Sequence, residues 1–190
     1  GQIARVCDQH GLTFGLEVEA NLIGQTGKLL QKIHEGVSDP AMLLIFDGAN
    51  LVCQGMTTEQ TYEEYQAMKN GLGWLHIKDY KKPIARSSHV DEESLKSFVP
   101  ADQGDSGHEA ILRDLKQGYL DLLAKLAQRG IPGLFLDLEP HVKGGGQFGG
   151  FSGPDGFGIA LRGLCRLLDY VGLPYDLRTF DDIRPNGSQH

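Results

Sequence analysis

The chain has 190 residues, of which 40% are hydrophobic, and a formal net charge of −7. This length is sufficient for one domain with its own core, and we expect a single domain over residues 1–190. The acidic balance argues against a nucleic-acid partner, which needs a basic stripe, and no apolar run is long enough to span a membrane.

Three cysteines, Cys7, Cys53 and Cys165, are odd in number and widely spaced. This pattern matches neither a disulfide framework nor the spacing of a zinc ribbon. We expect all three to be small buried apolar residues. A reducing cytoplasmic location is the natural setting for such a chain, whose first residues show no signal-peptide pattern.

Apolar runs and helical patterns alternate along the chain, which is typical of βα units around a parallel sheet. Four short apolar runs have the composition of strands, and they cover residues 13–19, 42–47, 73–76 and 133–139. Apolar periodicity with polar starts and glycine ends predicts helices over residues 3–9, 26–35, 57–69, 107–128 and 154–172. The helix from residue 57 begins with a capping-box pattern, Thr57-Thr58-Glu59-Gln60.

Two segments lie outside this alternation. Residues 80–106 are charged and irregular, and they are longer than connections in compact domains usually are. Residues 144–153 form a glycine-rich loop before the last helix. Its backbone N–H groups could hold an anion, although a flexible lid or a turn is an equal interpretation. The loop lacks the lysine and the spacing of a Walker or dinucleotide motif.

The four βα units indicate an α/β fold, a parallel (β/α) barrel of TIM type that is only half complete. A closed barrel of this type needs eight units. Four parallel strands leave two bare edges, so the chain is either half of a barrel or a small open sheet.

Each of the four apolar runs ends in a residue of a type that can bind metals, and these residues are Glu19, Asp47, His76 and Glu139. In a parallel barrel the carboxyl ends of the strands converge on one mouth. Three carboxylates and one imidazole there suit Mn²⁺, Mg²⁺ or Co²⁺, with Zn²⁺ as a further option. Taken alone, Asp47 before Gly48 is equally a turn residue, and it is the joint pattern that predicts a metal site.

Alternation along a strand places Glu17 and Glu19 on one face, with Glu19 nearer the mouth. We therefore expect Glu19 to be the ligand and Glu17 to be a deeper charge that needs a partner. By the same argument Glu139 is the mouth residue and Asp137 the deeper acid. Two glutamates that face each other across a cation suit proton transfer next to a carbonyl, with Glu19 and Glu139 as the catalytic pair.

Further polar residues follow these strands. Asp79, three residues after His76, would either orient the imidazole or hold substrate. Lys78 and Lys82 could neutralise an anionic substrate or intermediate, although solvated lysines are the default. His141 is a candidate substrate contact, and a surface histidine is an equal interpretation.

Taken together, these motifs resemble the C-terminal half of the xylose-isomerase-like barrel superfamily, over roughly residues 5–172. This superfamily includes sugar phosphate isomerases and epimerases, ketose 3-epimerases, inosose dehydratases and endonuclease IV. The segments that carry the resemblance are Glu19-x-Asn21, Phe46-Asp-Gly-Ala-Asn-Leu51, His76-Ile-Lys-Asp79, Gln103-Gly-Asp105, Leu138-Glu-Pro-His141 and residues 149–154.

The resemblance implies that the four ligands come from strands five to eight of a barrel, and that Glu19 and Glu139 act as acid and base. It implies a metal-dependent isomerase or epimerase for a small sugar or sugar phosphate. The competing hypothesis is a non-catalytic half-barrel that folds or dimerises without a complete substrate pocket. In either case the partner would be a second copy or a missing N-terminal half-barrel.

The chain also departs from the pattern of the family. Asn50 stands where the family often has His, and Lys82 stands where some epimerases have Arg. Gln103 replaces an acidic residue, and strands one to four have no counterpart. We expect Asn50, Asp79, Lys82 and His141 to contact substrate. Endonuclease IV is disfavoured, because its additional zinc-binding histidines are not matched.

Overall fold

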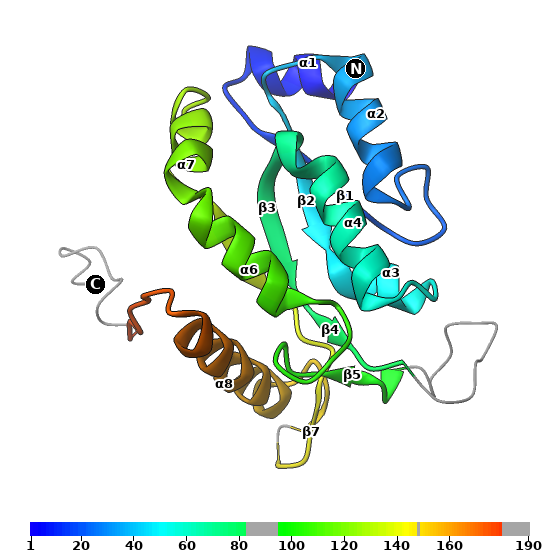
Figure 1. Cartoon of the computed structure of the whole chain (residues 1–190), viewed down its shortest axis with the longest axis vertical. Coiled ribbons are helices and arrows are strands. Elements are labelled where there is room, and N and C mark those ends of the chain that lie inside the picture. The colour runs from blue at the N-terminus through cyan, green and yellow to red at the C-terminus, as the bar shows by residue number, and fades with distance from the viewer. Residues whose placement is uncertain (83–94, 148, 180–190) are drawn as a thin grey trace, which may run out of the picture.

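The computed structural model describes residues 1–82, 95–147 and 149–179 (Figure 1). A four-stranded parallel sheet lies at its centre, with the strands in the order β1-β2-β3-β6. Their bounds are Phe14–Glu17 for β1, Met42–Asp47 for β2, Leu72–Ile77 for β3 and Phe135–Leu138 for β6. The predicted parallel α/β architecture with four barrel-type units is confirmed.

The principal helices form a layer along one face of this sheet. They are α2 (Gly27–Val37), α4 (Thr58–Met68), α6 (His108–Gln117), α7 (Tyr119–Ala127) and α8 (Pro154–Val171), with α1 (Gln2–Gln9) before the first strand. Contacts run from α2 to α4, from α4 to α6 and from α6 to α8, so the layer is continuous.

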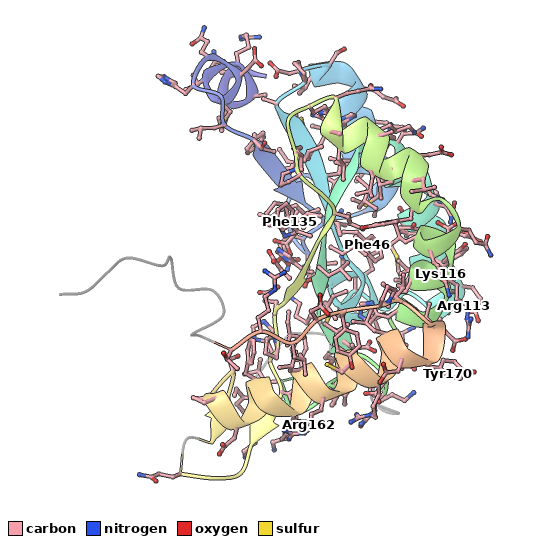
Figure 2. The ribbon with its side chains drawn as sticks, turned by 90° about the vertical axis from the view of Figure 1, so that its left-hand side faces the viewer. Phe46, Arg113, Lys116, Phe135, Arg162 and Tyr170 are labelled. Carbon is pink, nitrogen blue, oxygen red and sulfur yellow. The ribbon has the colours of Figure 1, made fainter. Side chains whose placement is uncertain are left out.

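The two faces of the sheet differ in what covers them. Phe46 points toward the helices and is fully buried in the main core, which leucines of α6 and α8 also enter. On the opposite face Phe135 is 37% exposed, and it stacks on Trp74 with 4.2 Å between ring centroids. Figure 2 shows Phe46 on the helix side and Phe135 on the open side. In a closed barrel this open face would line the interior.

Local sequence signals explain some of the helix ends. The Thr57 hydroxyl accepts from the Gln60 N–H and the Gln60 side chain accepts from the Thr57 N–H, so the predicted capping box is confirmed. Gly172 closes α8 with a φ of 72°, a left-handed conformation that glycine adopts without a Cβ clash.

The predicted helix over residues 107–128 is wrong as a single element. It is divided into α6 and α7 at Gly118, where φ is −96° and ψ is 11°. Glycine is a poor helix former, and apolar periodicity on both sides concealed this break. A short helix that was not predicted, α3 (Gly48–Cys53), directly follows β2, and the Asp47 carboxylate caps it by accepting from the Asn50 N–H.

The two unusual segments contain short antiparallel pairs. In the first, β4 (Asp79–Tyr80) pairs with β5 (Phe98–Val99), while residues 83–94 of the predicted irregular stretch lie outside the described residues. In the second, β7 (Lys143–Gly144) pairs with β8 (Gly150–Phe151). The chain includes no helix, within its described residues, that is long and apolar enough to cross a membrane. The three cysteines are free and half-buried, not buried as expected.

The contact between α2 and α4 has no room for a side chain at Gly27. A Cβ at this position would lie 2.1 Å from the Glu64 carbonyl oxygen, whereas a Cβ at Gly36 in the same helix would have no atom within 4 Å. We expect Gly27→Ala to lower the free energy of unfolding by about 1–3 kcal/mol. Gly36→Ala should be neutral or should stabilise by up to about 1 kcal/mol. Urea unfolding of both variants tests this, and equal effects would contradict it.

Candidate functional site

The carboxyl ends of the four parallel strands bring four ligand-type side chains together. Strand register places Asp47 beside His76, and His76 beside Asp137, two residues before Glu139. One ligand atom from each of four residues lies within 4.8 Å of the others, and these residues are Glu17, Asp47, His76 and Glu139. We call this group the strand-end cluster.

The first strand contributes Glu17 to this cluster, whereas Glu19 was the expected ligand. β1 ends at Glu17, and the chain then turns through Asn21, which has a φ of 62°. The Glu19 carboxylate accepts hydrogen bonds from the Ala20 N–H at 2.7 Å and from Asn50 Nδ2 at 3.2 Å. Because β1 ends two residues earlier than predicted, the alternation along the strand does not extend to Glu19.

His76 lies at the centre of the cluster. Its Nδ1 is 3.0 Å from Glu17 Oε1, 3.3 Å from Glu139 Oε2 and 3.9 Å from Asp47 Oδ2. The carboxylates of Glu139 and Glu17 outweigh partial burial and raise the pKa of His76 to about 10. His76 in turn, together with Lys78, lowers the pKa of Glu139 to about 2. Without a metal, His76 is therefore cationic and Glu139 ionised.

Asp47 is the fully buried member of the cluster. Its Oδ1 accepts from the Asn50 N–H at 3.1 Å. Its Oδ2 has no hydrogen bond of good geometry within the described residues, although Lys78 Nζ lies 2.9 Å away as an ion pair. Burial raises the pKa of Asp47 to about 6, and Lys78 opposes that rise.

This oxygen provides a test of whether the cluster fits a metal. The buried Asp47 carboxylate needs a positive charge beside it, which the Lys78 ammonium supplies in the metal-free chain and which a metal ion could supply in its place. The surrounding donors are carboxylate oxygens and one imidazole nitrogen, the ligand types of Mg²⁺, Mn²⁺ and Zn²⁺ sites. The residues present therefore fit a divalent cation.

Lys78 supplies a second cation next to the cluster. Its side chain is 5% exposed, and Nζ donates to Glu139 Oε2 at 3.0 Å besides pairing with Asp47. Burial alone would lower the pKa of this ammonium, but the two carboxylates outweigh burial and raise it. The proton of the Asp47–Lys78 pair therefore resides on the lysine.

Two of the four predicted substrate residues are engaged in the scaffold. The Asn50 amide donates to Glu17 Oε1, to the Val18 carbonyl and to Glu19 Oε2 at 3.1–3.2 Å, so it links the end of β1 to α3. The buried Asp79 carboxylate accepts the backbone N–H groups of Tyr80, Gly104 and Ser106. Their side chains hold protein groups in position.

The other two predicted substrate residues lie in different surroundings. Lys82 Nζ donates to the Gly55 carbonyl at 2.7 Å, so its ammonium is engaged with the backbone after α3. His141 lies beside the cluster, with Nε2 3.8 Å from Glu139 Oε1 and Nδ1 3.1 Å from Ser152 Oγ. His141 and Asn50 are therefore both next to cluster carboxylates, His141 beside Glu139 and Asn50 beside Glu17.

The glycine-rich loop carries an acidic group where an anion would have to bind. Asp155 lies in the first turn of α8, and a Cβ at Gly146 would be 2.2 Å from its Oδ2. A carboxylate in this place repels phosphate, so the structure favours the turn over the anion cradle.

The charge on His76 predicts a pH dependence of stability. Its pKa is about 10 in the folded metal-free chain, against an ordinary value of 6.5. Because the folded state binds this proton more tightly, the stabilisation is complete below about pH 6.5 and is lost as the pH rises toward 10. We expect the free energy of unfolding to fall across this window, and to fall less in His76→Gln. Urea unfolding with a chelator at several pH values measures both, and parallel profiles would contradict the assignment.

Comparison with known proteins identifies relatives by sequence and by fold. The family described as "Xylose isomerase-like TIM barrel" matches residues 1–143. No curated protein matches the chain. The solved structure of a xylose isomerase-like TIM barrel protein from Mycobacterium smegmatis in complex with magnesium is 18% identical, with a TM-score of 0.57. That alignment covers 91% of this chain and 49% of the other.

Two further structures have the same fold. A D-tagatose 3-epimerase-like protein is 18% identical over 90% of this chain and 52% of its own, with a TM-score of 0.50. The IOLI protein with a bound zinc atom is 15% identical over 93% of this chain and 55% of its own, with a TM-score of 0.51. The chain thus spans about half the length of these structures.

Proposed function

This chain belongs to the xylose isomerase-like TIM barrel family, and we propose that it is the metal-binding part of a sugar isomerase or epimerase. The reaction would be proton transfer next to a carbonyl. The observation that carries this proposal is the strand-end cluster, in which four adjacent parallel strands each contribute one ligand-type side chain. Neighbours of this fold include a magnesium complex, a zinc-bound protein and an epimerase-like protein, which supports the same class.

We propose that the cluster residues Glu17, Asp47, His76 and Glu139 hold one divalent cation. Mn²⁺, Mg²⁺ and Co²⁺ suit the three carboxylates, and Zn²⁺ is also compatible. When bound, the cation would stabilise the negative charge that develops on a carbonyl oxygen.

The chain's own carboxylates would move the proton. Glu139 follows β6 and Glu17 ends β1, so they come from the two edge strands of the sheet. Both carboxylates approach His76 Nδ1, Glu139 at 3.3 Å and Glu17 at 3.0 Å. The side chain of Glu139 is 43% exposed and is ionised in the metal-free chain, the protonation state that a base requires. Its contacts with His76 and Lys78 hold its pKa at about 2, where a carboxylate is a weak base, so this role requires those contacts to change when metal and substrate bind. Glu17 would return the proton, the role first expected of Glu19.

The substrate we propose is a small sugar or sugar phosphate, with His141 as its contact beside Glu139. The open face and the edges of β1 and β6 would be covered by four further strands. We propose that these come from a second copy or from an N-terminal half-barrel, with residues 1–190 forming the C-terminal half. The cytoplasmic location stays a prediction.

The choice between Glu17 and Glu19 can be tested directly. Glu17→Gln removes one charge from the cluster, whereas Glu19→Gln alters a carboxylate that binds backbone and amide groups. We expect Glu17→Gln to weaken Mn²⁺ binding by more than the roughly 10–100-fold typical of outer-shell changes, and Glu19→Gln to weaken it less. Isothermal calorimetry measures both affinities. A larger loss in Glu19→Gln would restore the first assignment.

The proposed chemistry predicts exchange with solvent. With Mn²⁺, a panel of ketoses in D₂O and the other half of the barrel present, from a second copy or from the parent protein, we expect deuterium to enter the sugar at the carbon next to the carbonyl. Glu139→Gln should abolish this signal, because an amide cannot accept the proton, and NMR or mass spectrometry measures it. Product without deuterium would indicate hydride transfer. Metal binding without turnover would favour a non-catalytic half-barrel.

A further inference from the structure

Lys78 contacts the same atoms that a metal would need. Its Nζ lies 2.9 Å from Asp47 Oδ2 and 3.0 Å from Glu139 Oε2. These two oxygens are also the ones that face His76 Nδ1, at 3.9 and 3.3 Å. The other oxygen of each carboxylate has a different neighbour, since Asp47 Oδ1 accepts from the Asn50 N–H and Glu139 Oε1 lies 3.8 Å from His141 Nε2. Lys78 and His76 therefore share the two oxygens that face each other within the cluster.

We propose that Lys78 is an internal counter-ion that occupies part of the cation position, so that divalent metal uptake requires its ammonium to leave Asp47 and Glu139. The inference rests on the metal site proposed above, and it adds an exchange of one cation for another. Binding of the metal ion and displacement of the Lys78 ammonium from the two carboxylates would then occur together.

Charge explains why such a counter-ion is present. Three carboxylates converge within the cluster, and Asp47 is completely buried. A buried carboxylate without a compensating charge is strongly destabilising. Lys78 satisfies this need in the metal-free chain, and its backbone is fixed because the buried His108 ring, through Nε2, contacts the Lys78 carbonyl at 2.9 Å.

Geometry explains why the counter-ion can be displaced. Asp47 Oδ2 receives no well-aligned hydrogen bond among the described residues despite the 2.9 Å approach, so one of the two contacts is imperfect. The other partner, Glu139, has a side chain that is 43% exposed, and the ammonium can leave toward that opening. A divalent cation that used both oxygens would also repel Nζ.

The test compares Mn²⁺ affinities of the wild type, Lys78→Met and Lys28→Met by calorimetry. Lys28 also pairs with a buried carboxylate, Glu64 at 3.2 Å, but outside the cluster, so it controls for the loss of one lysine–carboxylate pair, with a side chain that is 59% exposed. If Lys78 occupies the site most of the time, its removal should tighten binding about tenfold, because only the competent fraction of the wild type binds metal. Lys28→Met should bind Mn²⁺ with the same affinity as the wild type.

Each outcome bears on the inference. Equal or weaker binding by Lys78→Met would overturn it and leave the metal site standing. Absence of binding in all three proteins would overturn the metal site and this inference with it. If Lys78→Met does not unfold cooperatively, Lys78→Gln takes its place, since an amide keeps a donor without the charge.

A second measurement uses the unmodified chain. Lys78 should resist an amine-acylating reagent without metal and react faster with saturating Mn²⁺, as followed by peptide mass spectrometry. Unchanged labelling on loading would overturn the inference.

Discussion

Repulsion among the carboxylates at the strand ends is the constraint to which the rest of this structure responds. Parallel strands bring their carboxyl ends to one edge, so each strand that ends in an acid adds to the charge there. His76 and Lys78 offset that charge from within β3 and directly after it. Because His76 must lose its proton to become a ligand, metal uptake would release a proton as well as a lysine contact.

The surrounding scaffold fixes these groups from several directions. Asn50 links Glu17 and Glu19 through one amide. The Asp79 carboxylate gathers the N–H groups of Gly104 and Ser106, and this loop leads to His108, which contacts the carbonyl of Lys78. A Cβ at Gly104 would lie 2.1 Å from Asp79 Oδ1, so the close approach of this loop requires glycine. The segment His76–Asp79 is therefore held by side chain and backbone alike.

Much of this arrangement could be predicted from sequence, because its signals are local. The four apolar runs marked the strands, and residues 57–60 marked a helix start. The sequence did not predict that Glu17 lies in the strand-end cluster in place of Glu19. Alternation gives the face on which a residue lies but not the point at which the strand ends. The helix break at Gly118 was not predicted, because apolar periodicity continues on both sides of it. The hydrogen-bond partners of the Asn50 and Asp79 side chains lie about 25–33 positions away in the chain. Patterns in a single sequence do not predict such distant contacts.

The open face of the sheet connects the fold to the question of activity. Trp74 and Phe135 stack there, and Trp74 Nε1 donates to Asp137, so a layer of apolar and polar side chains lies directly below the strand-end cluster. In a closed barrel such a layer is packed against the other strands. Those strands would also surround the exposed side of the cluster, where Glu139 and His141 lie. The cluster itself needs only the four strands described here, whereas a substrate needs walls on both sides. The metal binding and the turnover proposed for this chain are therefore separable, and the first would not require the second.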